Sequence, residues 1–144
     1  VRLRQDGFKF SFDCEAEGPV RANVDSAAIV QALSNLLDNA VKYSTDRKEI
    51  VMRLEASATT AIISVRDFGV GISRREQERI FERFHRVGTG LVHDVRGSGW
   101  GLAIVHHIVQ AHSGEVSVAS EPRQGSTFFV RLPLAAEPSP PNGG

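Results

Sequence analysis

The chain has 144 residues, 41% hydrophobic and 24% charged, which is enough to bury the core of one ordinary domain. Seventeen lysines and arginines balance seventeen aspartates and glutamates, which argues against a broad basic surface for non-specific nucleic-acid binding. Cys14 is the one cysteine, which excludes an intrachain disulfide and a multi-cysteine metal site. No apolar run approaches the roughly 20 residues of a membrane span, and we expect an excised soluble domain.

Hydrophobic periodicity divides the chain into strands and helices. Phenylalanines alternate with polar residues near the start, which predicts a half-buried strand with Phe8, Phe10 and Phe12 on its inner side. The longest amphipathic segment follows side chains suited to capping a helix. In chain order, the patterns predict a strand, a helix, two strands, a short helix, a glycine-rich loop, a helix and two strands over residues 8–13, 26–43, 50–55, 61–66, 74–84, 85–98, 99–111, 115–120 and 126–132.

This mixed order of elements predicts an α+β fold rather than a doubly wound parallel sheet. We expect a two-layer α/β sandwich in which about three helices cover one face of a mixed sheet. One domain would comprise residues 1–136, with a mobile loop at about residues 85–98. The Pro- and Gly-rich residues 137–144 would form a disordered tail.

The predicted helix over residues 26–43 carries two opposed stripes. An apolar stripe faces one way, and a polar stripe lies about 200° around the helix. The polar stripe consists of Gln31, Asn35, Asp38, Asn39 and Lys42. Asparagine is a poor helix former, amide oxygens suit a hard cation such as Mg²⁺, and lysine suits a phosphate. From the helix alone, a ligand site and a solvated polar face remain open alternatives.

Two glycine-rich segments offer further candidate contacts. Residues 67–72 (DFGVGI) place the Asp67 carboxylate at the end of a predicted strand, where it could accept a hydrogen bond from an exocyclic amine such as that of adenine. An ordinary Asp-initiated turn is the alternative. Residues 97–102 (GSGWGL) open a predicted helix, whose first N–H groups suit a phosphate. They match neither a Rossmann fingerprint nor a P-loop, and simple loop-to-helix packing is the alternative.

Taken together, these segments resemble the catalytic ATP-binding domain of sensor histidine kinases. The asparagine box, first glycine box, phenylalanine box, second glycine box and closing strand motif of that family are similar in order and spacing to residues 35–44, 67–72, 81–86, 97–105 and 125–128. The resemblance covers roughly residues 6–134. It implies the Bergerat-type sandwich shared with gyrase-type ATPases and heat-shock chaperones, with a mobile ATP lid.

The resemblance also implies a role for each matching residue. Asp67 would accept a hydrogen bond from the adenine amine, with support from Thr127. Asn39 would ligate Mg²⁺, assisted by Asn35 as a second candidate ligand. The implied catalytic residues, which position the γ-phosphate, are Lys42, Arg86 and Asn35. The implied ATP-binding set is Asn35, Asn39, Lys42, Tyr43, Asp67, Gly69, Gly71, Ile72, Arg86, Gly97, Ser98, Gly99, Gly101, Leu102 and Thr127.

Two positions depart from the family pattern. Hydrolytic relatives carry a general-base glutamate at the position of Asn35, and an amide cannot take a proton from water, which favours a kinase over an autonomous ATPase. Trp100 stands where the family often has a smaller aliphatic residue. No histidine of the chain has the context of a phosphoacceptor, which in the family lies on a preceding dimerising helical hairpin.

The resemblance therefore implies a protein histidine kinase catalytic domain. Such a domain binds Mg-ATP and donates the γ-phosphoryl group to a histidine on a separate dimerisation domain of the same kinase, with a response regulator downstream. We expect a monomeric, cytoplasmic domain without a nucleic-acid partner, from a parent that could be anchored in the inner membrane. A non-catalytic nucleotide-sensing or docking module and an anti-sigma-type serine kinase of the same fold remain alternatives.

Overall fold

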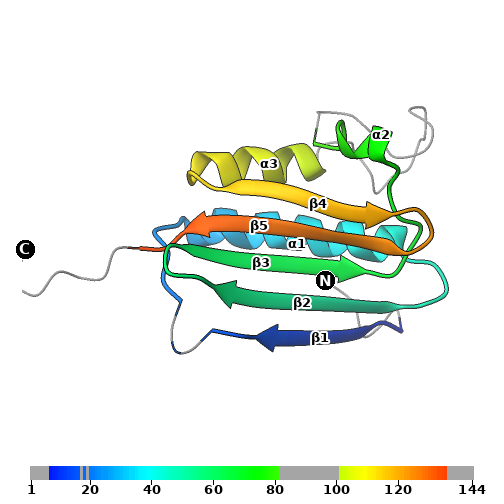
Figure 1. The fold of residues 1–144 in the computed structure, drawn as a ribbon, viewed down its shortest axis with the longest axis horizontal. Helices are drawn as coiled ribbons and strands as arrows, with labels where there is room; N and C mark the ends of the chain where they lie inside the picture. The colour runs from blue at the N-terminus through cyan, green and yellow to red at the C-terminus, as the bar shows by residue number, and fades with distance from the viewer. Residues whose placement is uncertain (1–6, 17, 19, 82–100, 136–144) are drawn as a thin grey trace, which may run out of the picture.

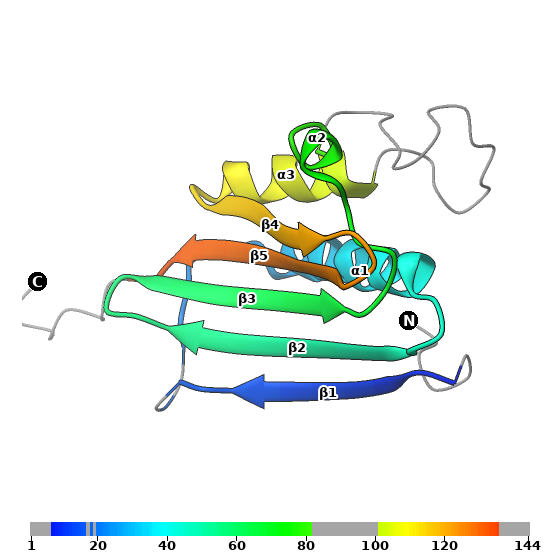
Figure 2. The ribbon, with the colours of Figure 1, turned by 45° about the vertical axis from the view of Figure 1, so that its right-hand side comes forward.

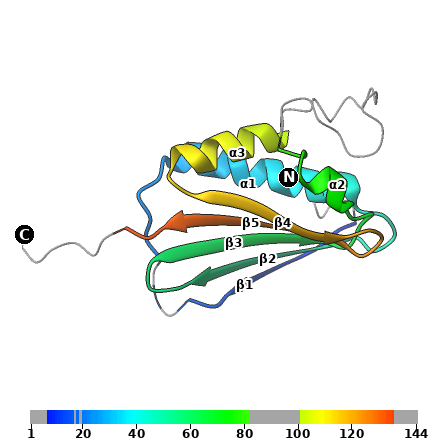
Figure 3. The same ribbon diagram turned by 45° about the horizontal axis from the view of Figure 1, so that its top comes forward.

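A mixed five-stranded sheet carries helices on one of its faces (Figures 1 and 3). The computed structural model describes residues 7–16, 18, 20–81 and 101–135. Its elements are β1 (Lys9–Cys14), α1 (Ser26–Tyr43), β2 (Glu49–Ala56), β3 (Thr60–Asp67), α2 (Arg74–Gln77), α3 (Gly101–Ala111), β4 (Glu115–Glu121) and β5 (Gly125–Pro133). The strand order is β1-β2-β3-β5-β4, with β1 parallel to β2 and the other neighbours antiparallel. The predicted α+β two-layer sandwich is confirmed.

The first helix begins and ends at the residues that the sequence predicts. The Asp25 side chain caps α1 by accepting a hydrogen bond from the Ala28 N–H at 3.2 Å. At the other end Ser44 is extended, and its hydroxyl donates to the Ala40 carbonyl at 2.6 Å. The intervening apolar stripe faces the sheet, with Leu36 fully buried.

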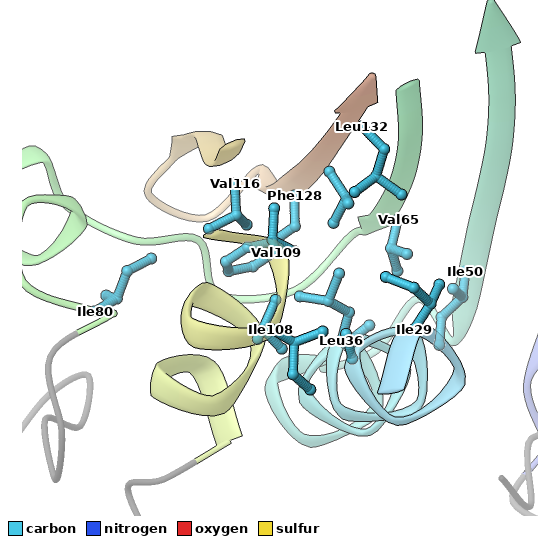
Figure 4. Close-up of a cluster of buried hydrophobic side chains, with 14 of the residues drawn as sticks. Ile29, Leu36, Ile50, Val65, Ile80, Ile108, Val109, Val116, Phe128 and Leu132 are labelled. Atoms are coloured by element: carbon cyan, nitrogen blue, oxygen red, sulfur yellow. The ribbon is translucent and has the colours of Figure 1, made fainter. Parts of the chain in front are cut away.

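The core fills the space between the sheet and the two longer helices (Figure 4). Leu36 of α1 and Val109 of α3 are fully buried and meet Val65 and Phe128 from the central strands. Ile80, in the turns after α2, belongs to the same buried cluster. Within the described residues, no helix is long and apolar enough to cross a membrane.

The end of α3 is tied to the beginning of α1 by one histidine. The Nδ1 atom of His112 lies 2.7 Å from the Ile108 carbonyl oxygen. A carbonyl can only accept, so Nδ1 carries the proton. The other ring nitrogen, Nε2, accepts a hydrogen bond from the Asp25 backbone N–H at 3.0 Å. His112 therefore joins the two helices over the sheet, a role that its isolated place in the sequence did not indicate.

Two elements differ from the expectation. Phe10 and Phe12 of β1 are 40% and 55% exposed, whereas Phe8 is buried. Both pair with β2 residues on the helix-facing side, but β1 is an edge strand farthest from α1 and α3 (Figure 2), so little covers them. The helix expected over residues 74–84 is also shorter, because α2 ends at Gln77 and turns follow to residue 81. Residues 82–84 lie outside the described part.

Candidate functional site

The predicted site residues that the structure describes converge on one end of the sandwich. At this end α1 and β3 finish while β5 and α3 begin, as seen on the right-hand side of Figure 1. The segment after β3 packs against the end of α1, because the Val70 N–H donates to the Tyr43 carbonyl at 3.1 Å. The asparagine-rich helix and the first glycine-rich segment therefore lie against each other.

The polar stripe of α1 divides into buried and exposed parts. Asn35, Asn39 and Lys42 are half-buried, whereas Gln31 and Asp38 are exposed. Within the part of the chain that the structure describes, the buried Nδ2 of Asn39 has no hydrogen-bond partner. Buried polar groups almost always have one. The unpaired Nδ2 is a donor, so it suits an acceptor such as a phosphate oxygen, whereas a metal ion would need the carboxamide oxygen.

Asp67 ends β3 as a carboxylate that is only 3% exposed. Its Oδ1 accepts a hydrogen bond from the Gly69 N–H at 2.9 Å, which fixes the side chain at the strand end. Burial raises the pKa of Asp67 above its ordinary value, and hydrogen bonds from the backbone N–H groups of Gly69 and Ser126 only partly oppose this effect. Carboxylates perturbed in this way are concentrated at functional sites.

The neighbour of this carboxylate on β5 is Ser126, which corrects the expectation for Thr127. Asp67 pairs with Ser126 across the antiparallel β3–β5 ladder, whereas Thr127 pairs with Arg66. Side chains alternate between the faces of a sheet, so Thr127 lies on the face opposite Asp67. The sequence held a signal for this placement: Phe128 is an apolar core residue, and Ser126 shares its face.

Three glycines near Asp67 allow other segments of the backbone to pass very close to them. A Cβ atom on Gly69 would overlap the Tyr43 carbonyl, and one on Gly71, whose φ is +74°, would overlap the end of β4. A Cβ on Gly125 would in turn overlap the Asp67 carbonyl. The glycines expected to approach a ligand therefore also lie against other segments of the chain itself.

Of the remaining predicted residues, some lie in the part of the chain that the structure describes and the others lie outside it. Tyr43 is half-buried at the end of α1, and the Lys42 Nζ lies 5.3 Å from its ring centroid. Ile72 is buried in the loop after β3, and Gly101 and Leu102 open α3. The residues and segments that lie outside the described part are Arg86, Gly97, Ser98, Gly99, Trp100, the expected lid at residues 85–98 and the tail at residues 137–144.

The amide side chains on α1 suit a magnesium ion that is bound mainly by water and by the phosphates of a nucleotide. Among the described residues, no cluster of three or more His, Cys, Asp or Glu side chains could hold a metal ion. The amide oxygens of Asn39 and Asn35 are hard donors of the type that Mg²⁺ accepts, and Mg²⁺ usually completes its shell with water and substrate phosphates. The half-buried asparagines on α1 are therefore compatible with a phosphate-borne Mg²⁺ ion.

The helix-backed mixed sheet, with a buried acid at the end of β3, defines an α+β domain. Residues 24–136 match the family of histidine kinase-, DNA gyrase B- and HSP90-like ATPases. This match covers well over half of the chain, and the chain belongs to that family.

Several relatives narrow the class to histidine kinases. The sensor histidine kinase RcsC of Escherichia coli K12 is 42% identical over 130 residues, which cover 90% of this chain and 14% of that protein. The sensor-like histidine kinase SenX3 of Mycolicibacterium smegmatis is 34% identical over 95% of this chain and 36% of that protein. The chain thus spans well under half the length of these relatives, and it is a catalytic domain of the histidine-kinase type.

Solved structures agree with this assignment. The mycobacterial sensor histidine kinase MprB superposes with a TM-score of 0.78 at 32% identity, over 92% of this chain and 88% of that one. Full-length ShkA in complex with AMPPNP gives a TM-score of 0.78 at 28% identity, over 94% of this chain and 27% of that one. The sandwich is therefore shared over nearly the whole of this chain.

Proposed function

We propose that this domain binds Mg-ATP and donates the γ-phosphoryl group to a histidine on a separate dimerisation domain of the same kinase. The observation that carries the proposal is the buried carboxylate of Asp67 at the end of β3. A carboxylate in that place needs hydrogen-bond donors, and the exocyclic amine of adenine supplies them. Ser126, beside it on β5, takes the supporting role first given to Thr127.

The phosphates would lie along the polar stripe of α1. Asn39, assisted by Asn35, would hold Mg²⁺ through the carboxamide oxygens, which are hard donors of the type that this ion accepts. Mg²⁺ would neutralise phosphate charge during transfer. Lys42 lies one turn after Asn39 and would position the γ-phosphate together with Arg86. The N-terminus of α3, with Gly97, Ser98, Gly99, Gly101 and Leu102, would face the triphosphate.

The proposed reaction is a phosphoryl transfer to nitrogen. The bond between the γ-phosphorus and the bridging oxygen of ATP breaks, a phosphorus–nitrogen bond forms at the acceptor imidazole, ADP leaves, and the imidazole N–H proton passes to solvent. Positioning and charge neutralisation supply most of the catalysis in such transfers. Asn35 has no basic group with which to activate water, which favours transfer over hydrolysis.

Two measurements test the proposal. Calorimetric titration with ATP, with and without Mg²⁺, should show saturable one-to-one binding that the metal alters. Radiolabelled ATP and a cognate dimerisation domain should then yield a phosphorylated histidine. Lys42→Ala should abolish the labelling, whereas Lys9→Ala, a matched loss of one positive charge on β1, should not. Absence of ATP binding at millimolar concentration would refute the proposal.

The same experiments separate the alternatives. ATP binding without transfer to any family histidine would favour a nucleotide-sensing or docking module, and so would unimpaired signalling by the full-length parent carrying Lys42→Ala and Arg86→Ala. Labelling of a serine on another protein would favour the serine kinase. In the proposed kinase, the domain works in the cytoplasm, where ATP is available, and a response regulator accepts the phosphoryl group from the histidine.

A further inference from the structure

A serine on β4 is the meeting point of hydrogen bonds from three segments around the proposed base pocket. The Ser120 Oγ accepts from the Ile72 backbone N–H at 2.7 Å, donates to the Gly125 carbonyl at 2.9 Å, and lies 2.8 Å from the Ser126 Oγ. Ser120 pairs with Ser126, and Ser126 pairs with Asp67. The three side chains therefore form one row across neighbouring strands, on the face that the helices cover.

The hydroxyl protons in this row can be placed by elimination. Ser120 has one proton and two lone pairs. The Gly125 carbonyl can only accept, so the Ser120 proton is directed to it, and the Ile72 N–H takes one lone pair. The remaining contact, between the two hydroxyls, is satisfied only if Ser126 donates its proton to the second lone pair of Ser120.

This arrangement decides what Ser126 offers to a ligand. With its proton directed at Ser120, Ser126 presents only lone pairs to the pocket, next to the acceptor oxygens of Asp67. Two adjacent acceptors suit an exocyclic amine, whose two N–H bonds can reach both of them, and they disfavour a carbonyl oxygen at the same place. Adenine has an exocyclic amine at the position where guanine has a carbonyl.

Gln77 of α2 links the loop after β3 to β4 through two hydrogen bonds. Its Nε2 donates to the Ile72 carbonyl at 2.7 Å and to the Ser120 carbonyl at 3.0 Å. Both partners are acceptors, so the amide nitrogen must face them. The side chain thereby holds the loop after β3 against the end of β4. This keeps the Ile72 N–H in place to donate its hydrogen bond to Ser120.

We propose that Ser120 is a positioning residue that sets the purine selectivity of this site by holding the Ser126 hydroxyl as an acceptor. The proposal rests on ATP binding at Asp67. Removing the Ser120 hydroxyl frees the Ser126 proton. It can then turn toward the Asp67 carboxylate, which weakens that acceptor for adenine, or toward a guanine carbonyl, which improves the contact with guanine.

The test compares the dissociation constants of ATP and GTP by calorimetry. Ser120→Ala should weaken ATP roughly 3- to 10-fold while leaving GTP unchanged or tighter. Ser120→Thr keeps a hydroxyl and should restore the wild-type ratio. Ser117→Ala is the matched control, because that serine lies on β4 but on the other face and bonds to Arg131 at 2.7 Å. It should alter neither affinity.

The outcomes are distinguishable. Equal weakening of ATP and GTP by Ser120→Ala would show a merely structural role and overturn the proposal. If Ser120→Ala fails to fold, Ser126→Ala removes the same acceptor while keeping the Ser120 bonds to Ile72 and Gly125, and an unchanged ATP-to-GTP ratio in that variant would overturn the proposal as well. Failure of the wild-type domain to bind ATP would instead refute the proposed function, and this inference with it.

Discussion

Asp67→Asn should separate the stability of the domain from its affinity for ATP. The Asn oxygen can keep the hydrogen bond from the Gly69 N–H, so its amide nitrogen faces the proposed pocket. The adenine amine then loses a charged acceptor, worth about 1.5–3 kcal/mol, which corresponds to a roughly 10- to 150-fold weaker ATP affinity. Calorimetric titration of both proteins with Mg-ATP measures this change.

The same substitution should remove a pH-dependent loss of stability from the nucleotide-free domain. The raised pKa of Asp67 means that the folded state holds its proton more tightly than the unfolded state. Between the ordinary aspartate pKa and the raised value, the wild-type free energy of unfolding therefore falls as the pH rises. Asp67→Asn removes this decline.

Urea unfolding at acidic and neutral pH checks the argument, with the difference between variant and wild type as the quantity of interest. That difference should grow in favour of the variant as the pH rises. A variant that loses stability relative to wild type on going from acidic to neutral pH would refute the desolvation argument. An unchanged ATP affinity would refute the assignment of Asp67 to the adenine amine.

Three further substitutions test other parts of the structure. Asn39→Ala should abolish the Mg²⁺-dependent part of the ATP affinity, measured by calorimetry with and without the metal, and should cost little stability because its Nδ2 has no partner among the described residues. His112→Ala should lower the free energy of unfolding by about 1–2 kcal/mol in urea titrations and leave ATP affinity unchanged. Gly69→Ala should cost about 3 kcal/mol or more, or prevent folding, because its Cβ overlaps the Tyr43 carbonyl; wild-type thermal stability of that variant would contradict the packing.

Local patterns predicted the elements well because most of their signals are local. The long helix was correct at both ends, since its cap at Asp25 and its apolar stripe are written in consecutive residues. The exposure of Phe10 and Phe12 was missed for the opposite reason. Alternation predicts a strand with an apolar side, but only the order of strands in the sheet says that β1 is at the edge, beyond the helical layer.

The motifs predict each residue of the site, and the structure places one of them, Thr127, on the face of the sheet opposite Asp67. A motif fixes the order of Ser126 and Thr127 but says nothing about which of them shares a face with Asp67. That depends on the register between β3 and β5, which are far apart in sequence. The contacts of Ser120 and His112 were missed for the same reason, because each joins elements that only the fold brings together.

The close packing around Gly69, Gly71 and Gly125 affects how such sequences diverge during evolution. Each of these glycines is required by the backbone of another segment, so selection for folding alone would preserve them. A descendant that had lost its enzymatic role would still carry both glycines of the DFGVGI segment. Asn39 and Asp67 would be free to drift, and Asp67 would drift readily, since burying its charge costs stability. The glycines would therefore mark descent from this family, whereas under the proposed function the loss of Asp67 or Asn39 would mark the loss of nucleotide binding.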